Sequence, residues 1–201
     1  MVMQTNRAIL RGSLVQLPEF SHETGGKRFF RFFLEVPRLS GALDTLPVVT
    51  PECVLDSLDL SGGELLAVSG QLRTHNVRQD GRRKLLIFLY AESITAEDGA
   101  PANELSLTGT LCREPVYRRT PLGREICDVM LAVRRGYHRA DYIPCILWGS
   151  TARRGSLMHT GDSLHITGRL QSRIYTKLTQ DGAVEMTAYE VSAMSMEEEV
   201  F

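Results

Sequence analysis

The second half of this 201-residue chain carries aromatic and basic side chains at spacings suited to binding a flat, negatively charged polymer. In residues 164–175, apolar side chains at positions 164, 166 and 170 predict the inward face of a strand, so the odd-numbered positions share the outer face. These outward residues are Arg169, Gln171, Arg173 and Tyr175. In residues 142–148, an inward face of Ile143, Cys145 and Leu147 leaves Tyr142 and Trp148 outward in the same way.

A loop that begins with Arg134-Arg135-Gly136 adds further members to this outer surface. The full set of predicted nucleic-acid-binding residues is Tyr137, Tyr142, Trp148, Tyr175, Arg134, Arg135, Arg169, Arg173 and Lys177. Aromatic rings stack on bases at about 1–3 kcal/mol each, while arginines follow the phosphates, so this combination is typical of a single-strand binder. The alternative is that the rings complete a core or a subunit interface and that the arginines form an ordinary solvated strand face.

Period-2 alternation in the second half predicts five strands, which cover residues 105–111, 127–133, 142–148, 164–175 and 186–194. Between the third and fourth strands, Ser150 to His159 suits one short helix closed by Thr160-Gly161. Three strands, a helix and two more strands is the order of the five-stranded OB barrel, which commonly binds oligonucleotides. An SH3-like barrel or another small β-fold is the alternative.

The chain is an internal duplication, because residues 6–94 recur in degenerate form as residues 103–194. Asn6, Gly12 and Pro18 correspond to Asn103, Gly109 and Pro115, each 97 positions later. We therefore expect an all-β protein of two tandem five-stranded OB barrels with one short helix per domain. The expected division is residues 1–96 for the first domain, 97–102 for a linker, 103–196 for the second domain and 197–201 for an acidic C-terminal tip. In the first copy, Thr50-Pro51 predicts a helix start with threonine as the cap and proline at the first helical position.

The two copies differ at the positions that carry the rings. The four aromatic positions of the second copy correspond to Ser40, Thr45, Pro51 and Val77 in the first. Four phenylalanines instead surround the second strand of the first copy, at positions 29, 30, 32 and 33. Alternation buries Phe30 and Phe32 and leaves Phe29 and Phe33 outward, as an interface patch, a rebuilt stacking site or ordinary packing.

Composition excludes several classes of function. The net charge is −1, but the residues from Ala102 onward carry +3 once the three terminal glutamates are set aside, and only three of the 23 basic residues are lysines. No apolar run approaches the ~18 residues that would span a membrane, and the N-terminal residues lack the apolar stretch of a signal peptide. Four cysteines without CxxC spacing predict reduced thiols in the cytoplasm. No phosphate loop, metal-ligand spacing or G-x-S-x-G turn occurs, so we expect neither an enzyme nor a cofactor.

Motifs across nearly the whole chain resemble the bacterial single-stranded DNA-binding protein family. They include Asp141-Tyr142-Ile143-Pro144-Cys145-Ile146-Leu147-Trp148-Gly149, Gly161 to Leu170, and Gly70-Gln71-Leu72-Arg73-Thr74 in the first copy. The resemblance implies sequence-independent binding of single-stranded DNA in replication, recombination or repair, with Tyr137, Tyr142, Trp148 and Tyr175 at the base-stacking positions. It also implies a nucleoid-associated cytoplasmic protein and a homodimer, since the family uses four barrels per functional unit. A primosome-type subunit, or an OB-fold interaction scaffold with vestigial nucleic-acid binding, is the alternative.

The last five residues, Glu197-Glu198-Glu199-Val200-Phe201, partly resemble the acidic end with which the family docks replication and repair proteins. The long linker that precedes this end in the family is missing here. A protein-interaction tip and a merely solvated acidic terminus are therefore both open.

Overall fold

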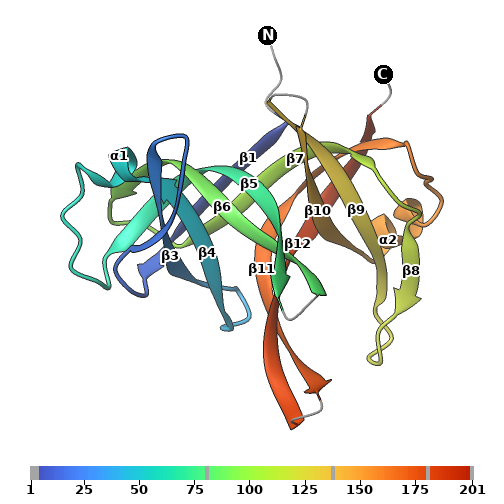
Figure 1. The fold of residues 1–201 in the computed structure, drawn as a ribbon. Helices are drawn as coiled ribbons and strands as arrows, with labels where there is room; N and C mark the ends of the chain where they lie inside the picture. Colours follow the sequence, from blue (N-terminus) through green and yellow to red (C-terminus); the bar gives the residue numbers. More distant parts are fainter. Residues whose placement is uncertain (1–4, 80–81, 137–138, 180–181, 200–201) are drawn as a thin grey trace.

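The computed structural model describes residues 5–79, 82–136, 139–179 and 182–199, which form two OB barrels joined side by side (Figure 1). The elements of the first barrel are β1 (Asn6–Leu14), β2 (Glu19–Thr24), β3 (Lys27–Pro37), β4 (Leu43–Pro51), α1 (Glu52–Leu55), β5 (Leu65–Gln79) and β6 (Arg82–Ala96). Those of the second are β7 (Ala102–Leu111), β8 (Val116–Arg119), β9 (Glu125–Arg135), β10 (Arg139–Trp148), α2 (Ser150–Gly155), β11 (Ser163–Thr179) and β12 (Gly182–Glu199).

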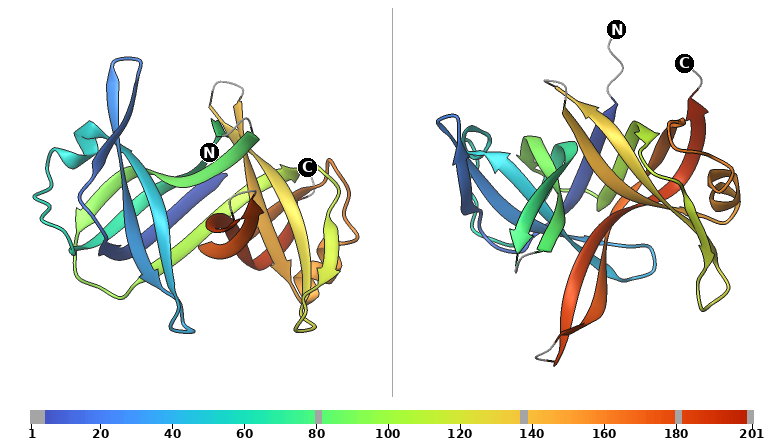
Figure 2. Two further views of the ribbon diagram at one scale, coloured as in Figure 1. Left: turned by 60° about the horizontal axis from the view of Figure 1, so that its bottom comes forward. Right: turned by 45° about the vertical axis from the view of Figure 1, so that its right-hand side comes forward.

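The strands form one twelve-stranded sheet in the order β2-β3-β4-β6-β5-β1-β7-β11-β12-β10-β9-β8. Additional pairings of β1 with β3 and of β7 with β9 curl each half of the sheet into a barrel. At the centre, β1 and β7 run antiparallel from the pair Asn6–Leu107 to the pair Arg11–Ala102, so the two barrels share a continuous sheet (Figure 2). The long β11–β12 hairpin projects beyond the rest of the molecule.

The duplicated glycines mark places where strands approach too closely for a side chain. A Cβ atom at Gly168 would lie 2.3 Å from the carbonyl oxygen of Ser192, and one at Gly70 would lie 2.0 Å from that of Tyr90. Gly70 sits at a β-bulge between β5 and β6, and Gly168 at one between β11 and β12. The bulge bends the hairpin so that the sheet can close, which explains why both copies keep these glycines.

Two aspartates lock the barrels together in a reciprocal arrangement. Asp44 of β4 is fully buried and accepts hydrogen bonds from the backbone N–H and the hydroxyl of Ser172 in β11, at 2.7 and 2.9 Å. Asp141 of β10 accepts the equivalent bonds from Thr74 in β5, at 2.7 and 3.2 Å. Each carboxylate also binds an arginine, namely Arg38 for Asp44 and Arg73 for Asp141. Each barrel therefore supplies the acceptor for a strand of the other.

The pKa of Asp44 is lower than its ordinary value. Burial alone would raise this pKa, but the hydrogen bonds from Arg38 and Ser172 outweigh burial because they stabilise the carboxylate. The pKa of Arg38 is raised, chiefly by its hydrogen bond to Asp44. The contact is therefore between a carboxylate and a guanidinium at neutral pH.

The structure confirms the two OB barrels and corrects details of the prediction. Each barrel has one more strand than expected, β2 or β8, which forms a hairpin with the following strand. The helices are shorter: α2 ends at Gly155, and α1 begins at Glu52, with Pro51 rather than Thr50 at the cap position because Thr50 is buried in β4. Residues 97–101 connect the barrels.

The acidic residues near the C-terminus are not a separate tip. Glu197–Glu199 belong to β12, where they pair with residues 163–165 of β11, and Glu198 forms a 3.2 Å ion pair with Arg154. The prediction placed the end of the fifth strand too early because alternation breaks at the bulge. Val200 and Phe201 lie outside the described residues. In the part of the chain that the structure describes, no helix is long and apolar enough to cross a membrane.

The Asp44→Ala variant should lower the free energy of unfolding by roughly 2–3 kcal/mol at pH 7. This loss is no larger than the loss expected when one partner of a fully buried ion pair is removed, because the Arg38 side chain is 23% exposed to solvent. Since the native pKa is depressed, the contribution of Asp44 is present above the unfolded pKa of about 3.9 and is lost as the pH falls through the native value. Urea unfolding at pH 7 and near pH 3 measures the free energy of unfolding of both proteins. The difference between Asp44→Ala and wild type should be smaller at the lower pH.

The control is Asp98→Ala, which removes an exposed carboxylate from the connection between the barrels. It should leave the unfolding free energy nearly unchanged at both pH values. An Asp44→Ala variant as stable as wild type at pH 7 would contradict the role given to this contact.

Candidate nucleic-acid interface

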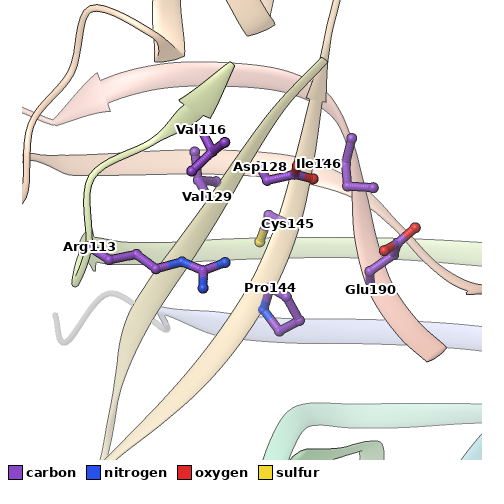
Figure 3. A pocket seen from close by; sticks show the side chains of 8 residues that line it. All are labelled: Arg113, Val116, Asp128, Val129, Pro144, Cys145, Ile146 and Glu190. Carbon is purple, nitrogen blue, oxygen red and sulfur yellow. The ribbon is translucent and has the colours of Figure 1, made fainter. Parts of the chain in front are cut away.

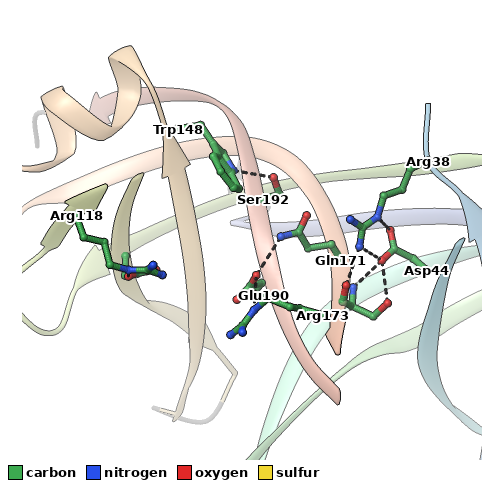
Figure 4. A network of polar contacts seen from close by, with 10 residues as sticks. Arg38, Asp44, Arg118, Trp148, Gln171, Arg173, Glu190 and Ser192 are labelled. Atoms are coloured by element: carbon green, nitrogen blue, oxygen red, sulfur yellow. Dashed lines mark hydrogen bonds and ion pairs between the residues drawn. The ribbon is translucent and has the colours of Figure 1, made fainter. Parts of the chain in front are cut away.

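Trp148 ends β10 on the outer face of the second barrel, as the alternation predicted. Its indole Nε1–H donates a 3.0 Å hydrogen bond to the hydroxyl of Ser192 on the neighbouring strand β12 (Figure 4). Its backbone N–H donates to the hydroxyl of Thr151, which in turn donates to the Trp148 carbonyl. The side chain is half-buried, so these contacts fix the ring while part of it stays accessible. A ring held in place loses little conformational freedom when a ligand stacks on it.

Tyr142 and Tyr175 are 48% and 38% exposed and lie on the same outer face as Trp148, as expected. Tyr142 is tied to the first barrel, because its backbone N–H donates a 3.1 Å hydrogen bond to the hydroxyl of Thr74. Tyr175 lies on the projecting hairpin, with the Arg173 guanidinium 5.5 Å from its ring centroid. That distance is within the range of a cation–π contact. The fourth predicted aromatic, Tyr137, lies outside the described residues.

The predicted basic residues differ in whether a carboxylate lies near them. Arg134 and Arg135 are exposed at the end of β9, and Arg135 lies 3.8 Å from Asp141. Arg173 lies 3.6 Å from Glu190. Lys177 belongs to β11, but its side chain is outside the described part of the structure.

Arg169 differs from its counterpart in the first barrel in the partners of its side chain. In the first barrel, Gln71 donates a 2.7 Å hydrogen bond to Glu92 at the bulge of β6. In the second, Arg169 replaces the glutamine, and Met194, 75% exposed, stands at the bulge position of the glutamate. Among the described residues Arg169 has no ion pair, and its buried Nε atom has no hydrogen-bond partner. A cation without a carboxylate is available to a phosphate.

Two carboxylates lie among these rings and arginines, and the sequence reasoning missed both. Glu190 of β12 is 8% exposed and accepts a 3.0 Å hydrogen bond from Gln171. Gln171 does share the outer face, but this contact buries it to 7% exposure instead of leaving it open as predicted. Asp128 of β9 pairs with Arg118 at 2.6 Å. Alternation around the buried residues of β12 would have placed Glu190 and Ser192 on this face.

A hollow of about 330 Å³ lies on the outer face of the second barrel and is lined by both of these carboxylates (Figure 3). The predicted nucleic-acid-binding residues that the structure describes are not part of its lining. Its lining is Arg113, Val116, Asp128, Val129, Pro144, Cys145, Ile146 and Glu190. Proline, valine and isoleucine form an apolar floor, while an arginine and two carboxylates lie at its sides. Burial raises the pKa of Cys145, so this thiol remains protonated. In the described residues no cluster of three or more His, Cys, Asp or Glu side chains could hold a metal ion.

The first barrel lacks the four aromatic positions but has an aromatic cluster of its own. Phe32 is buried at 1% exposure, as predicted, but Phe29, Phe30 and Phe33 are all half-buried. Phe29 is covered by His22, whose ring stacks on it at 4.8 Å between centroids. The expected outward pair, Phe29 and Phe33, is therefore only partly accessible.

Comparison with known proteins relates this chain to a protein family by sequence and by fold. The model of the "Single-strand binding protein family" matches residues 102–198, which is the second barrel. The chain is 35% identical over 80 residues to single-stranded DNA-binding protein B of Bacillus subtilis, covering 36% of this chain and 71% of that protein. It is 32% identical over 138 residues to the single-stranded DNA-binding protein of Thermus aquaticus, covering 58% of this chain and 52% of that protein.

Two crystal structures of the Thermus aquaticus single-stranded DNA binding protein extend the likeness to both barrels. A deletion mutant superimposes with a TM-score of 0.75 at 25% identity over 98% of this chain and 95% of that chain. The wild-type protein superimposes with a TM-score of 0.79 at 24% identity, which concerns the fold, over 98% and 93% of the two chains. With the second barrel matched in sequence and both barrels matched in fold, this chain belongs to the single-strand binding protein family.

Proposed function

We propose that this protein binds single-stranded DNA without sequence preference in replication, recombination or repair, and that the second barrel supplies the main binding face. The observation that carries the proposal is the placement of Tyr142, Trp148 and Tyr175 on one outer face with arginines among them. Two relatives of this chain are named single-stranded DNA-binding proteins. The role is one of binding, in which rings and cations hold the strand and no reaction takes place.

The rings explain why binding would not depend on sequence. Every base has a flat π-face, so stacking on Tyr142, Trp148 or Tyr175 favours single strands over duplexes and hardly distinguishes one base from another. The hydrogen bond between Trp148 and Ser192 holds the indole before the ligand arrives. Arg134 and Arg169, which have no ion pair among the described residues, would bind phosphates.

The carboxylates of the face would moderate the affinity. Glu190 lies beside Arg173 and is nearly buried, so its charge opposes the approach of a phosphate and competes for the guanidinium. We therefore expect Glu190 to weaken the binding of phosphates by Arg173 on this face.

We also propose that two chains associate into a homodimer with four barrels. The outer face of the central strands, opposite the cores, carries Ile9 and Arg11 from β1 and Ser106, Thr108 and Thr110 from β7, all half-buried. The small side chains of Ser106, Thr108 and Thr110 on β7 allow a second sheet to approach to about 10 Å. A second copy of the same face fits this surface.

Replacing a stacking ring should weaken binding of oligo(dT) without unfolding the protein. Tyr142→Ala, Trp148→Ala and Tyr175→Ala should each cost about 1–3 kcal/mol of binding free energy, because each removes the face on which one base stacks. Fluorescence anisotropy of a labelled oligo(dT) at low salt measures the dissociation constants.

The matched control is Tyr117→Ala on β8. Tyr117 is 38% exposed, like Tyr175, but it lies on the edge strand β8, where its hydroxyl donates a hydrogen bond to Glu125. The Tyr117→Ala variant should bind as wild type does. Equal losses for Tyr117→Ala and Tyr175→Ala would refute the assignment of the binding face.

Glu190→Gln should tighten binding by about threefold to tenfold at low salt. The change removes a negative charge beside Arg173, and interactions at such distances in water are on the order of 1 kcal/mol. Glutamine keeps an oxygen that can accept the hydrogen bond from Gln171. The same anisotropy titration gives the ratio, and weaker binding by Glu190→Gln would mean that Glu190 is needed to position Arg173.

In solution the chain should have about twice its 22.5 kDa mass, measured by light scattering after size exclusion. Thr108→Glu, which places a charge in the centre of the proposed contact, should reduce this to the mass of one chain. Thr24→Glu, at an exposed position of the β2–β3 hairpin, is the control and should remain dimeric. A wild-type protein with the mass of one chain would exclude the homodimer.

A further inference from the structure

The two barrels differ in the charge of one hairpin, which joins β5 to β6 in the first barrel and β11 to β12 in the second. Residues 78–84 of the first barrel contain four basic residues and one acidic residue. The corresponding residues 176–185 of the second contain one basic residue and two acidic residues. The barrel that has lost the four aromatic positions therefore carries the hairpin suited to a polyanion, and the barrel that keeps the rings carries a slightly acidic one.

A row of outward residues leads from this basic hairpin along β6. Ile87, Leu89 and Ala91 are buried, so the even-numbered positions share the outer face. These positions are Lys84, Leu86, Phe88 and Tyr90, of which Leu86 is 37% exposed and the others are half-buried. The row therefore combines a cation at the hairpin end with two aromatic rings further along the strand.

Arg73 lies over this row and is positioned by the other barrel. Its guanidinium lies 5.8 Å from the centroid of the Tyr90 ring, and its residue pairs with Phe88 across β5 and β6. One of its nitrogens is 3.2 Å from the Asp141 carboxylate. The Arg73 side chain is only 14% exposed, so it supports the Tyr90 ring, and the half-buried ring itself offers a flat surface to a ligand.

The register shows that the ring of the first barrel has moved by one strand. In the second barrel, Ile146 of β10 pairs with Ser192 of β12, and the Trp148 indole reaches that serine. In the first barrel, Val49 of β4 pairs with Tyr90 of β6, so Tyr90 stands at the position of Ser192. Pro51 stands at the position of Trp148. An aromatic side chain is thus lost from β4 and gained on its neighbour β6.

A groove of about 190 Å³ joins the two outer faces. Lys84 and Leu86 of β6 line one side, and Pro144, Tyr175 and Ala188 of the second barrel line the other. Tyr175, at the end of the proposed binding face, is therefore separated from the basic hairpin only by this groove. A polymer that stacks on Tyr175 can continue over Lys84 toward Phe88 and Tyr90.

We propose that the first barrel binds a second stretch of the same DNA strand through a site of different composition. The strand leaves Tyr175, crosses the groove, places phosphates near Lys84 and Arg78, and stacks bases on Phe88 and Tyr90 beside Arg73. In this arrangement, stacking on aromatic rings contributes most of the binding in the second barrel, and contacts between cations and phosphates contribute more in the first. The proposal rests on single-strand binding by the second barrel, but it predicts in addition that the first barrel contributes only when the DNA is long enough to reach both barrels.

The experiment compares two lengths of labelled oligo(dT) by anisotropy over a range of salt concentrations. An oligomer of about 8 nucleotides fits within the ~4–16 nucleotides that one OB fold covers, whereas one of about 35 nucleotides can reach both barrels. Tyr90→Ala should weaken binding of the longer oligomer by about five- to 100-fold and leave the shorter one unchanged. Lys84→Ala combined with Arg78→Ala should reduce the slope of log affinity against log salt for the longer oligomer by roughly 0.7 per lost phosphate contact.

Matched variants separate stacking and charge from damage to the fold. Tyr90→Phe keeps the ring and should bind both lengths as wild type does, while Tyr90→Leu keeps only apolar bulk and should resemble Tyr90→Ala. Lys27→Ala removes an exposed cation at the start of β3, on the β2–β3 hairpin that projects from the first barrel (Figure 2). No residue of this hairpin lines the groove, so the variant should leave the salt slope unchanged.

The outcomes distinguish this proposal from the function on which it rests. If wild-type protein binds both lengths but the Tyr90 and Lys84 variants bind the longer one normally, the first barrel makes no contact and the inference is wrong. A Tyr90→Leu variant that changes the oligomeric state instead of the affinity would make this face a contact between copies, which also overturns it. If wild-type protein binds neither length at low salt, both proposals fail together.

Discussion

The antiparallel pairing of β1 with β7 is the constraint on which the rest of this structure depends. It joins two barrels into one twelve-stranded sheet and fixes their relative orientation through backbone hydrogen bonds. The reciprocal contacts of Asp44 with Ser172 and of Asp141 with Thr74 secure that orientation at a second place. The same contacts reach the proposed binding faces, because Thr74 holds the backbone of Tyr142 and Asp141 holds Arg73 near Tyr90. The contacts that join the barrels therefore also position residues on their outer faces.

The duplication shows which residues the fold requires and which it leaves free. Both copies keep the glycines at the bulge, since a Cβ atom there would collide with a carbonyl of the neighbouring strand. Both keep an asparagine whose side chain bonds the backbone of β5 or β11, Asn6 to Leu72 and Asn103 to Leu170. The outer faces have no such constraint, so rings and charges have diverged there. The loss of aromatics at Pro51 and the gain of one at Tyr90 follow this pattern.

Period-2 alternation was enough to predict the barrels, the burial of Ile143, Cys145 and Leu147, and the outward side of Tyr142 and Trp148. It could not predict contacts between residues far apart in the chain. The pairing of Asp44 with Ser172 spans 128 positions, and the shielding of Gln171 by Glu190 depends on how two strands lie together. The short strands β2 and β8 were missed because they form edge hairpins with exposed residues on both sides. The last strand was cut short where the bulge interrupts alternation, which made Glu197–Glu199 look like a tail.

The most direct test of the account uses the single tryptophan, which lies at the centre of the proposed face. Unlabelled oligo(dT) is titrated into wild-type protein while the emission of Trp148 is followed, with a duplex of the same length as comparison. The account predicts quenching that saturates with the single strand, little quenching with the duplex, and an affinity that falls with salt at roughly −0.7 per phosphate contact on a double-logarithmic plot. An emission that does not change with oligo(dT) at low salt, together with no binding, would contradict it.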